Sequence, residues 1–300
     1  MFDTTPRLDC AGRPLLLDRT RIMGIVNVTP DSFSDGGQGV DADAAIAHGL
    51  RLAAEGADLL DVGGESTRPG AAGVAAEEEL RRVLPVLSRL VRETSLPVSV
   101  DTSQPEVMRA AVAAGAGLIN DVRALRRPGA LEAAAALGVP VCVAHMLGDP
   151  GSMQMNPQYD DVVGEVHRFL AERVFACELA GIERKRVLVD PGFGFGKTLQ
   201  HNLSLLASLR RFSDLGAGLL VGLSRKSMIG ALTGQDVPAE RVAGSVAAAL
   251  LAAQRGARIV RVHDVAATRQ ALAVWEAAGE DPPVPVAPGK PAAPAWPDDD

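Results

Sequence analysis

The chain alternates short apolar runs with Ala/Leu-rich stretches, and this alternation constrains its fold more than any other feature. A polar or glycine-rich turn typically separates an apolar run from the helical pattern that follows it. The eight runs are Ile22–Val26, Leu59–Val62, Val98–Val100, Leu118–Ile119, Val139–Val143, Val187–Val189, Leu219–Val221 and Ile259–Val262. Runs of this length without polar alternation are typical of strands buried on both faces, as in a parallel sheet.

Helical patterns lie between these runs. They include Ala42–Glu55, Glu77–Arg92, Pro105–Ala114, Asp161–Ala180 and Ala239–Arg255. Before the third of these helices, Ser103 and Glu106 have the spacing of a capping box. Eight strand–helix units in one chain predict an α/β fold, a single-domain (β/α)8 TIM barrel, with a doubly wound open sheet as the alternative.

Both ends of the chain differ from this repeating pattern. Within residues 1–20, Leu8–Leu17 has Gly12 at a turn, which predicts an N-terminal hairpin that closes the barrel bottom. Residues 21–280 are expected to form the catalytic barrel. Residues 281–300 are rich in Pro and Ala and end in three aspartates, so we expect a disordered tail and no second domain.

Charge and hydropathy exclude two classes of partner. The 30 basic and 37 acidic residues give a net charge of −7, and no run of five basic residues occurs, which argues against a nucleic-acid surface. The first ten residues contain Asp3, Arg7 and Asp9, so they are not a signal peptide. The longest apolar stretch, Ala243–Ala253, is shorter than the ~20 residues that a membrane span needs.

Three cysteines, Cys10, Cys142 and Cys177, are an odd number and have no metal-site spacing. Neither a disulfide framework nor a zinc site is therefore expected. A reduced, cytoplasmic protein without a nucleic-acid or membrane partner is the resulting prediction.

Polar residues follow the expected strands at all eight positions. They are Asn27, Gly63–Gly70, Asp101–Thr102, Asn120–Asp121, His145, Asp190–Lys197, Ser224–Ser227 and Arg261–Asp264. Any one of them has an ordinary explanation, because a strand-end Asp or Asn often caps a helix and a lone histidine is often structural. In a barrel, however, the loops after all eight strands share one rim. The whole set therefore predicts a binding pocket.

The residue types suggest the chemistry of this pocket. Buried carboxylates at Asp101 and Asp190 accept from N–H groups, while the Asn120 amide both donates and accepts, which suits a flat heterocycle with an amide and amino edge. Arg261 and His263, two apart on a strand, face the same side. With Asn27 and Lys226 they suit an anion, and Mg²⁺ bridging phosphate oxygens suits such ligands.

Seven segments of the chain carry a recognisable set of motifs. They are Gly24–Gly37, Gly63–Gly70, Ser99–Thr102, Ile119–Val122, Asp190–Lys197, Gly222–Ser227 and Arg261–Val265. On these motifs the chain resembles the dihydropteroate synthases of the folate pathway, from about Arg21 to His263. The resemblance implies a transferase and sulfonamide target that joins 6-hydroxymethyl-7,8-dihydropterin diphosphate to p-aminobenzoate. The implied products are 7,8-dihydropteroate and diphosphate.

The resemblance also implies roles for individual residues. The pterin edge is expected to meet Asp101, Asn120, Asp190 and Lys226. The diphosphate is expected to meet Asn27, Arg261, His263 and Arg68, with Mg²⁺ as cofactor and Asn27 as its protein ligand. The p-aminobenzoate is expected to pack against Phe33, Thr67, Pro69, Phe195, Lys226 and Ser227, and Met146 is a further expected substrate contact. The expected catalytic residues are Asp101, Lys226, Arg261, His263 and Arg68.

The implied mechanism requires neutralised charge on the leaving diphosphate, which Mg²⁺ and the basic residues supply. An ionised Asp101 would stabilise the cation that remains on the pterin, and closure of the loops after the first two strands would exclude water. The resemblance further implies a homodimer through barrel helices, with which the apolar face around Val242–Leu251 is compatible.

Two alternatives remain at this point. A pterin-binding methyltransferase barrel would share Asp101, Asn120 and Asp190, but it would lack the Asn27–Gly37 loop and the pair Arg261 and His263. A catalytically silent paralogue would bind pterins without turnover, although such proteins often lose loop residues that this chain keeps.

Overall fold

Eight parallel strands form a closed barrel in the computed structural model, which describes residues 6–28, 38–66, 73–148, 153–215 and 218–279. The strand order around the barrel is β10-β3-β4-β5-β6-β7-β8-β9. The strands are β3 (Arg21–Asn27), β4 (Leu59–Gly63), β5 (Val98–Asp101), β6 (Leu118–Asp121), β7 (Val141–Ala144), β8 (Val187–Asp190), β9 (Gly218–Val221) and β10 (Ile259–Val262). The predicted (β/α)8 barrel is confirmed, and the doubly wound alternative is wrong.

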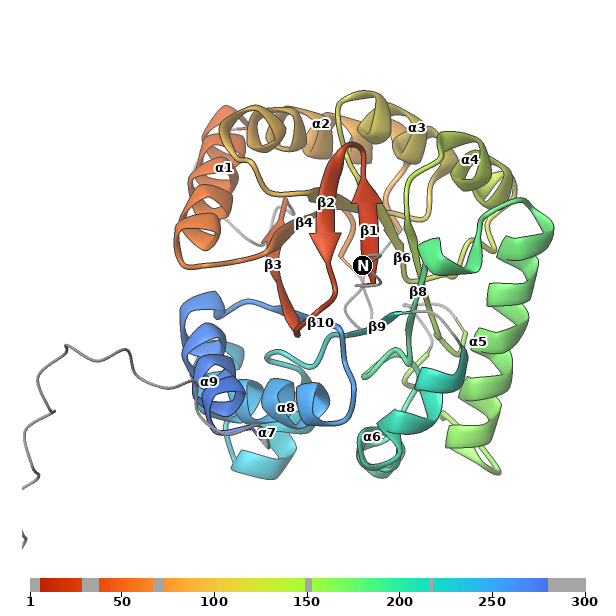
Figure 1. The fold of residues 1–300 in the computed structure, drawn as a ribbon, viewed down its shortest axis with the longest axis vertical. Helices are drawn as coiled ribbons and strands as arrows, with labels where there is room; N and C mark the ends of the chain where they lie inside the picture. Colours follow the sequence, from red (N-terminus) through yellow and green to blue (C-terminus); the bar gives the residue numbers. More distant parts are fainter. Residues whose placement is uncertain (1–5, 29–37, 67–72, 149–152, 216–217, 280–300) are drawn as a thin grey trace, which may run out of the picture.

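The helices form a ring outside the strands (Figure 1). Within the described ranges they are α1 (Gln38–Ala54), α2 (Ala76–Glu93), α3 (Pro105–Ala113), α4 (Ala130–Leu137), α5 (Val162–Leu179), α6 (Leu199–Ala207), α7 (Ser227–Thr233), α8 (Val242–Gln254) and α9 (Val265–Ala277). Shorter 3-10 helices span Arg184–Arg186, Leu209–Leu215 and Pro238–Glu240. In the part of the chain that the structure describes, no helix is long and apolar enough to span a membrane.

The capping box predicted before α3 is wrong. The helix begins at Pro105 after Gln104, and no side chain caps it. The Ser103 hydroxyl instead donates to the carboxylate of Asp121 at the end of β6. Because Asp121 is fully buried, it needs several donors, and it competes successfully for the Ser103 hydroxyl.

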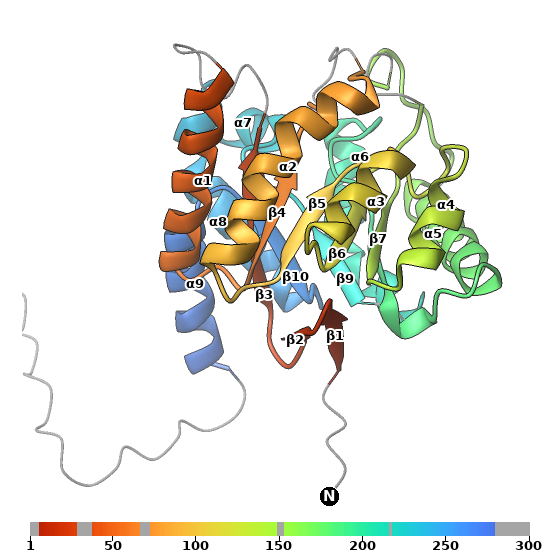
Figure 2. The ribbon, with the colours of Figure 1, turned by 90° about the horizontal axis from the view of Figure 1, so that it is seen from above.

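The N-terminal hairpin closes one end of the barrel, as predicted. Strands β1 (Arg7–Cys10) and β2 (Arg13–Leu16) pair antiparallel, and Figure 2 shows them beyond the ends of the barrel strands. Their apolar side chains form one buried cluster with the first inward-facing layer of the barrel. The cluster is Leu8, Cys10, Leu15, Leu17, Met23, Leu59, Leu118, Cys142, Leu188, Leu220 and Ile259. The 281–300 tail lies outside the described residues, and the domain bounds stay predictions.

Side chains two positions along a strand face the same way, so the next inward-facing residues can be read from the apolar layer. They are polar on four strands, with Asp61 after Leu59, Asn120 after Leu118, Asp190 after Leu188 and Arg261 after Ile259. The barrel interior therefore changes from apolar at the hairpin end to polar toward the carboxyl ends of its strands. This change positions the site.

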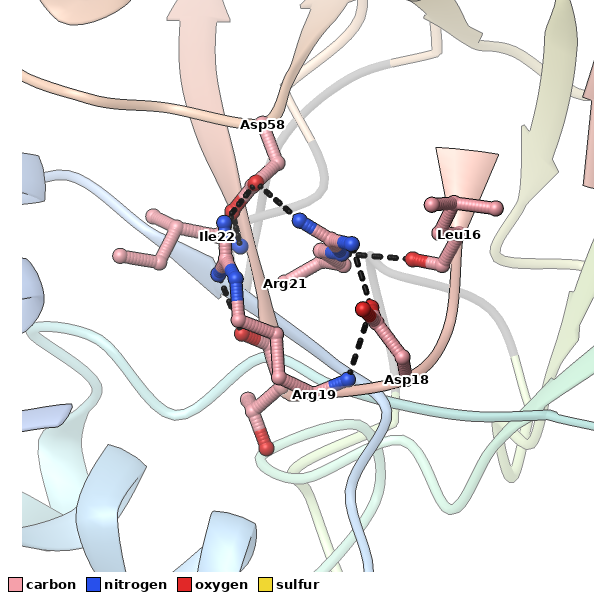
Figure 3. A network of polar contacts seen from close by, with 7 residues as sticks. Leu16, Asp18, Arg19, Arg21, Ile22 and Asp58 are labelled. Atoms are coloured by element: carbon pink, nitrogen blue, oxygen red, sulfur yellow. Dashed lines mark hydrogen bonds and ion pairs between the residues drawn. The ribbon is translucent and has the colours of Figure 1, made fainter. Parts of the chain in front are cut away.

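An ion-pair network joins the hairpin to the barrel (Figure 3). Asp58, just before β4, accepts from the side chains of Arg19 and Arg21 and from the backbone N–H of Ile22. Its side chain is 11% exposed, whereas that of Asp18, which also pairs with Arg21, is 51% exposed. The network fixes the start of β3 against the start of β4.

We expect Asp58→Asn to lower the free energy of unfolding by about 2 kcal/mol, because charge-assisted bonds to two part-buried arginines are weakened. Asp18→Asn is the matched control and should cost less than about 0.5 kcal/mol, since exposed pairs contribute little. Urea unfolding of both variants checks this, and equal effects would contradict the account.

Candidate active site

Four inward-facing side chains form one hydrogen-bonded chain at the carboxyl end of the barrel, in which Asp101 contacts Arg261, Arg261 contacts Asp61, and Asp61 contacts Asn120. Arg261 of β10 donates from Nε to Asp61 Oδ2 at 2.6 Å and from Nη2 to Asp101 Oδ2 at 2.9 Å. The Asn120 amide donates from Nδ2 to the same Asp61 oxygen at 3.1 Å. The structure thus brings together three residues predicted for the site and adds Asp61, which the prediction missed.

Asp61 lies inside an expected apolar strand, in Leu59–Val62, whereas the predicted site included only residues at strand ends. A charged residue in the middle of such a run is itself a signal, because interior barrel positions are usually filled by branched apolar side chains. The Asp61 side chain is fully buried. Its other oxygen, Oδ1, has no hydrogen-bond partner among the described residues.

Burial raises the pKa of the Asp101 carboxyl to about 8. Arg261 opposes this shift, while the negative charges of Asp61, Glu79 and Asp121 add to it. One guanidinium thus faces more than one carboxylate, which favours a proton on Asp101 at neutral pH. A cationic ligand beside Asp101 would release this proton.

Lys226 is the residue immediately before α7. Its Nζ donates to the Phe193 carbonyl and lies 4.5 Å from the centroid of the Phe195 ring, a cation–π contact. Burial lowers the pKa of Lys226 to about 8, and the nearby Asp190 opposes that shift. Asp190 Oδ1 in turn accepts from the backbone N–H of Gly192 at 2.8 Å. Lys226, Asp190 and Phe195 therefore share one side of the site.

Another lysine, Lys197, is buried and ties the loops after β7 and β8 together. Its Nζ lies 2.9 Å from His145 Nδ1 and donates to the carbonyls of Gly192 at 2.9 Å and Phe195 at 3.1 Å. Burial, with the Lys197 charge, lowers the pKa of His145 to about 2, so the imidazole is neutral and accepts at Nδ1. His145 is therefore structural. Sequence reasoning missed the role of Lys197, because a lysine after a glycine-rich loop gives no sign of its acceptors.

The remaining predicted residues are placed as follows. His263 is half-buried, and its Nδ1 lies 3.0 Å from the Ser224 hydroxyl. Asn27 is half-buried at the end of β3, where it pairs in register with Gly63. Met146 is buried, and Ser227 is exposed at the start of α7. Phe33, Thr67, Arg68 and Pro69 lie outside the described residues.

A further ion pair that the prediction missed lies at the base of the loop after β4. Arg123 donates to Glu65 Oε2 at 3.2 Å and to Glu65 Oε1 at 3.1 Å. The Glu65 side chain is only 6% exposed. This pair holds Glu65 against the loop that follows β6.

The fold and this arrangement define a (β/α)8-barrel enzyme with its site at the carboxyl ends of the strands. Residues 23–263 match the family of pterin binding enzymes. Dihydropteroate synthase of Escherichia coli (strain K12) is 53% identical over 271 residues, which cover 90% of this chain and 96% of that protein.

Two solved structures extend the comparison. Dihydropteroate synthase of Xanthomonas albilineans with 4-aminobenzoic acid is 67% identical, with a TM-score of 0.89, over 93% of this chain and 100% of that one. The Yersinia pestis dihydropteroate synthase with a sulfonamide drug is 51% identical, with a TM-score of 0.87, over 91% of this chain and 98% of that one. The chain belongs to the dihydropteroate synthase family and is a transferase. This membership sets aside the methyltransferase and the silent-paralogue alternatives.

Proposed function

We propose which of the described residues bind the pterin, the diphosphate and the p-aminobenzoate in the synthase reaction. In this reaction 6-hydroxymethyl-7,8-dihydropterin diphosphate and p-aminobenzoate give 7,8-dihydropteroate and diphosphate. The observation that carries the proposal is the meeting of Asp101, Asn120 and Arg261 inside the barrel mouth. The Asp101 carboxylate and the Asn120 amide, inside the barrel mouth, match the donors and acceptors along a pterin edge. Asp190 and Lys226 complete this edge from the other side of the site.

The chemical step breaks the bond between the exocyclic methylene and the diphosphate oxygen, and the electron pair leaves with diphosphate. The positive charge spreads over the electron-rich dihydropterin, where an ionised Asp101 stabilises it. The amine of p-aminobenzoate then donates its lone pair to the methylene carbon, and the resulting arylammonium group loses its proton to the released diphosphate. Because the aryl amine is a weak base, no strong protein base is needed.

The leaving diphosphate is expected to meet Asn27, His263, Arg261 and Arg68. Among the described residues, no group of three or more His, Cys, Asp and Glu side chains has the arrangement of a metal site. Asn27 fits Mg²⁺ as a single oxygen ligand, since Mg²⁺ often keeps several waters and binds mainly through substrate phosphates. When bound, Mg²⁺ would neutralise charge on the leaving group.

The p-aminobenzoate side of the proposed site is formed by Phe195, Lys226 and Ser227, with Met146 nearby. The outer wall is assigned to Phe33, Thr67 and Pro69 on the two loops outside the described residues. The Lys226 ammonium beside the Phe195 ring offers a cation to the carboxylate and an apolar face to the benzene ring.

We expect 4-aminobenzenesulfonamides to inhibit this protein in competition with p-aminobenzoate, because they share its aryl amine and carry a polar group in place of the carboxylate. The test is initial-rate kinetics with each substrate varied in turn at several inhibitor concentrations. Competition with the pterin substrate alone would contradict the placement of Phe195 and Ser227.

The proposal includes a cytoplasmic homodimer. Leu232 and Leu251, on α7 and α8, and Val237 in the segment between these helices are at least one-third exposed, and α8 carries the apolar face expected for subunit contact. Light scattering after size-exclusion chromatography tests the oligomeric state, and a monomer at micromolar concentration would contradict it.

A further inference from the structure

We propose that Asp61 is a positioning residue of the synthase site: its carboxylate holds the Arg261 guanidinium and the Asn120 amide where they meet the pterin diphosphate substrate. The inference rests on the roles proposed above, with Asn120 at the pterin edge and Arg261 at the diphosphate of the same substrate. It assigns no substrate contact to Asp61 itself.

The location of Asp61 suits this role. It lies two residues before the end of β4, facing the barrel interior, and it pairs in register with Ile25 on one side and Ser99 on the other. Its two partners come from β10 and β6, each separated from β4 by one strand. One oxygen, Oδ2, therefore ties together strands on both sides of β4.

The energetics indicate that the charge at Asp61 serves a purpose other than stability. A buried carboxylate costs several kcal/mol to desolvate, and an apolar residue in such a place is often neutral or stabilising. The other oxygen, Oδ1, has no hydrogen-bond partner in the described part of the chain, and this adds to the cost. Leu59, two residues earlier, shows that an apolar side chain fits the same face of β4.

Arg261 has two carboxylate partners with different exposure. Asp61 is 0% exposed, while Asp101 is 13% exposed and lies nearer the mouth. When Asp101 turns to a pterin, the bond from Nε to Asp61 still fixes the plane of the guanidinium. Asp61 thus pre-organises Arg261, so that less rotamer freedom is lost on binding.

Asp61 also acts on the charge of Asp101. The groups that face Asp101 are Arg261 from β10, Asp61 from β4, Glu79 from α2 and Asp121 from β6. Asp61 raises the pKa of Asp101. Removing the charge at Asp61 should therefore lower that pKa and shift the rise of kcat/KM with pH toward lower pH.

The test compares Asp61→Asn with Ser99→Ala. Ser99 is the register neighbour of Asp61, is equally buried, and its hydroxyl has no partner among the described residues, so the control disturbs the same part of the barrel without touching Arg261. For Asp61→Asn we expect KM for the pterin substrate to rise about 10- to 100-fold, with little change in KM for p-aminobenzoate and the pH shift described. Ser99→Ala should change none of these.

A folded Asp61→Asn protein with wild-type pterin KM and pH profile would overturn the inference, as would equal effects of Ser99→Ala. Where Asp61→Asn does not fold, Asp61→Glu keeps the charge and displaces the carboxylate by one methylene. This variant should raise the pterin KM while leaving the pH profile in place, and an unchanged KM would again overturn the inference.

Calorimetric binding of 6-hydroxymethylpterin separates this inference from the proposed function. The measurement needs neither p-aminobenzoate nor turnover, so it tests Asp61 independently of the reaction. Weaker binding by Asp61→Asn and normal binding by Ser99→Ala supports the inference, and equal binding overturns it. Wild-type binding without product formation would instead count against the proposed chemistry.

Discussion

Asp101→Asn is expected to lower kcat/KM by about 10²- to 10³-fold, the cost of removing one preorganised electrostatic contact to a charged transition state. The amide keeps the size of the side chain and loses the negative charge that stabilises the pterin cation. Initial rates of diphosphate release measure the effect. Asp160→Asn, which removes an exposed carboxylate, is the control and should leave the rate unchanged.

The pH dependence of wild type gives the same prediction a second test. Since the pKa of Asp101 is raised to about 8, activity that needs its carboxylate should rise as the pH approaches that value from below. The pKa of Lys226 is lowered to about 8, so loss of its ammonium should lower activity on the basic side. The free energy of unfolding has the opposite pH dependence. The raised pKa of Asp101 contributes stability at low pH, and this contribution is lost as the pH rises through about 8. Asp101→Asn should abolish both trends at this group, and an unchanged pH profile would contradict the assignment.

Gly192→Ala is expected to lower the free energy of unfolding by more than about 4 kcal/mol, which only severe mechanisms produce. Gly192 has a φ of +69°, and a Cβ there would come within 1.8 Å of the His145 carbonyl oxygen. The loops after β7 and β8 would have to separate. That movement would break the contacts of Lys197 and displace Phe195.

Gly138→Ala is the matched control for this prediction. Its φ is +72°, but no atom lies within 4 Å of the Cβ position, so only the backbone strain of about 1–2 kcal/mol remains. Urea unfolding of the two variants measures the difference. Equal destabilisation would show that the loops after β7 and β8 are not packed as described.

The barrel was predictable because its eight strands are largely buried on both faces and therefore appear as mainly apolar runs. The rim was predictable for the same reason, since polar residues such as Asp101 and Asn120 interrupt the pattern where the strands end. The hairpin followed from Leu8–Leu17, which has a turn residue, Gly12, near its middle. Local pattern and architecture agree at these places.

Asp61 was missed because its importance depends on a partner 200 positions away in the sequence. A run of four residues with one acid reads as a strand, and only the closed barrel shows that the acid faces Arg261. The capping box at Ser103 failed for a related reason, because buried Asp121 takes the hydroxyl. Such choices depend on tertiary contacts, which local propensity does not contain.

The roles of Phe33, Thr67, Arg68 and Pro69 remain predictions from the family resemblance, as do Mg²⁺ and the dimer. The structure does describe residues that precede these two loops in the sequence. Glu65, held by Arg123, fixes the chain shortly before Thr67. Asn27 is the last residue of β3 and pairs in register with Gly63.

The most direct test of the central claim is diphosphate release from 6-hydroxymethyl-7,8-dihydropterin diphosphate, measured with and without p-aminobenzoate and with an EDTA control. We expect diphosphate release that depends on Mg²⁺, is stimulated by p-aminobenzoate and is matched by formation of 7,8-dihydropteroate. Tight binding of the pterin without release under these conditions would contradict it.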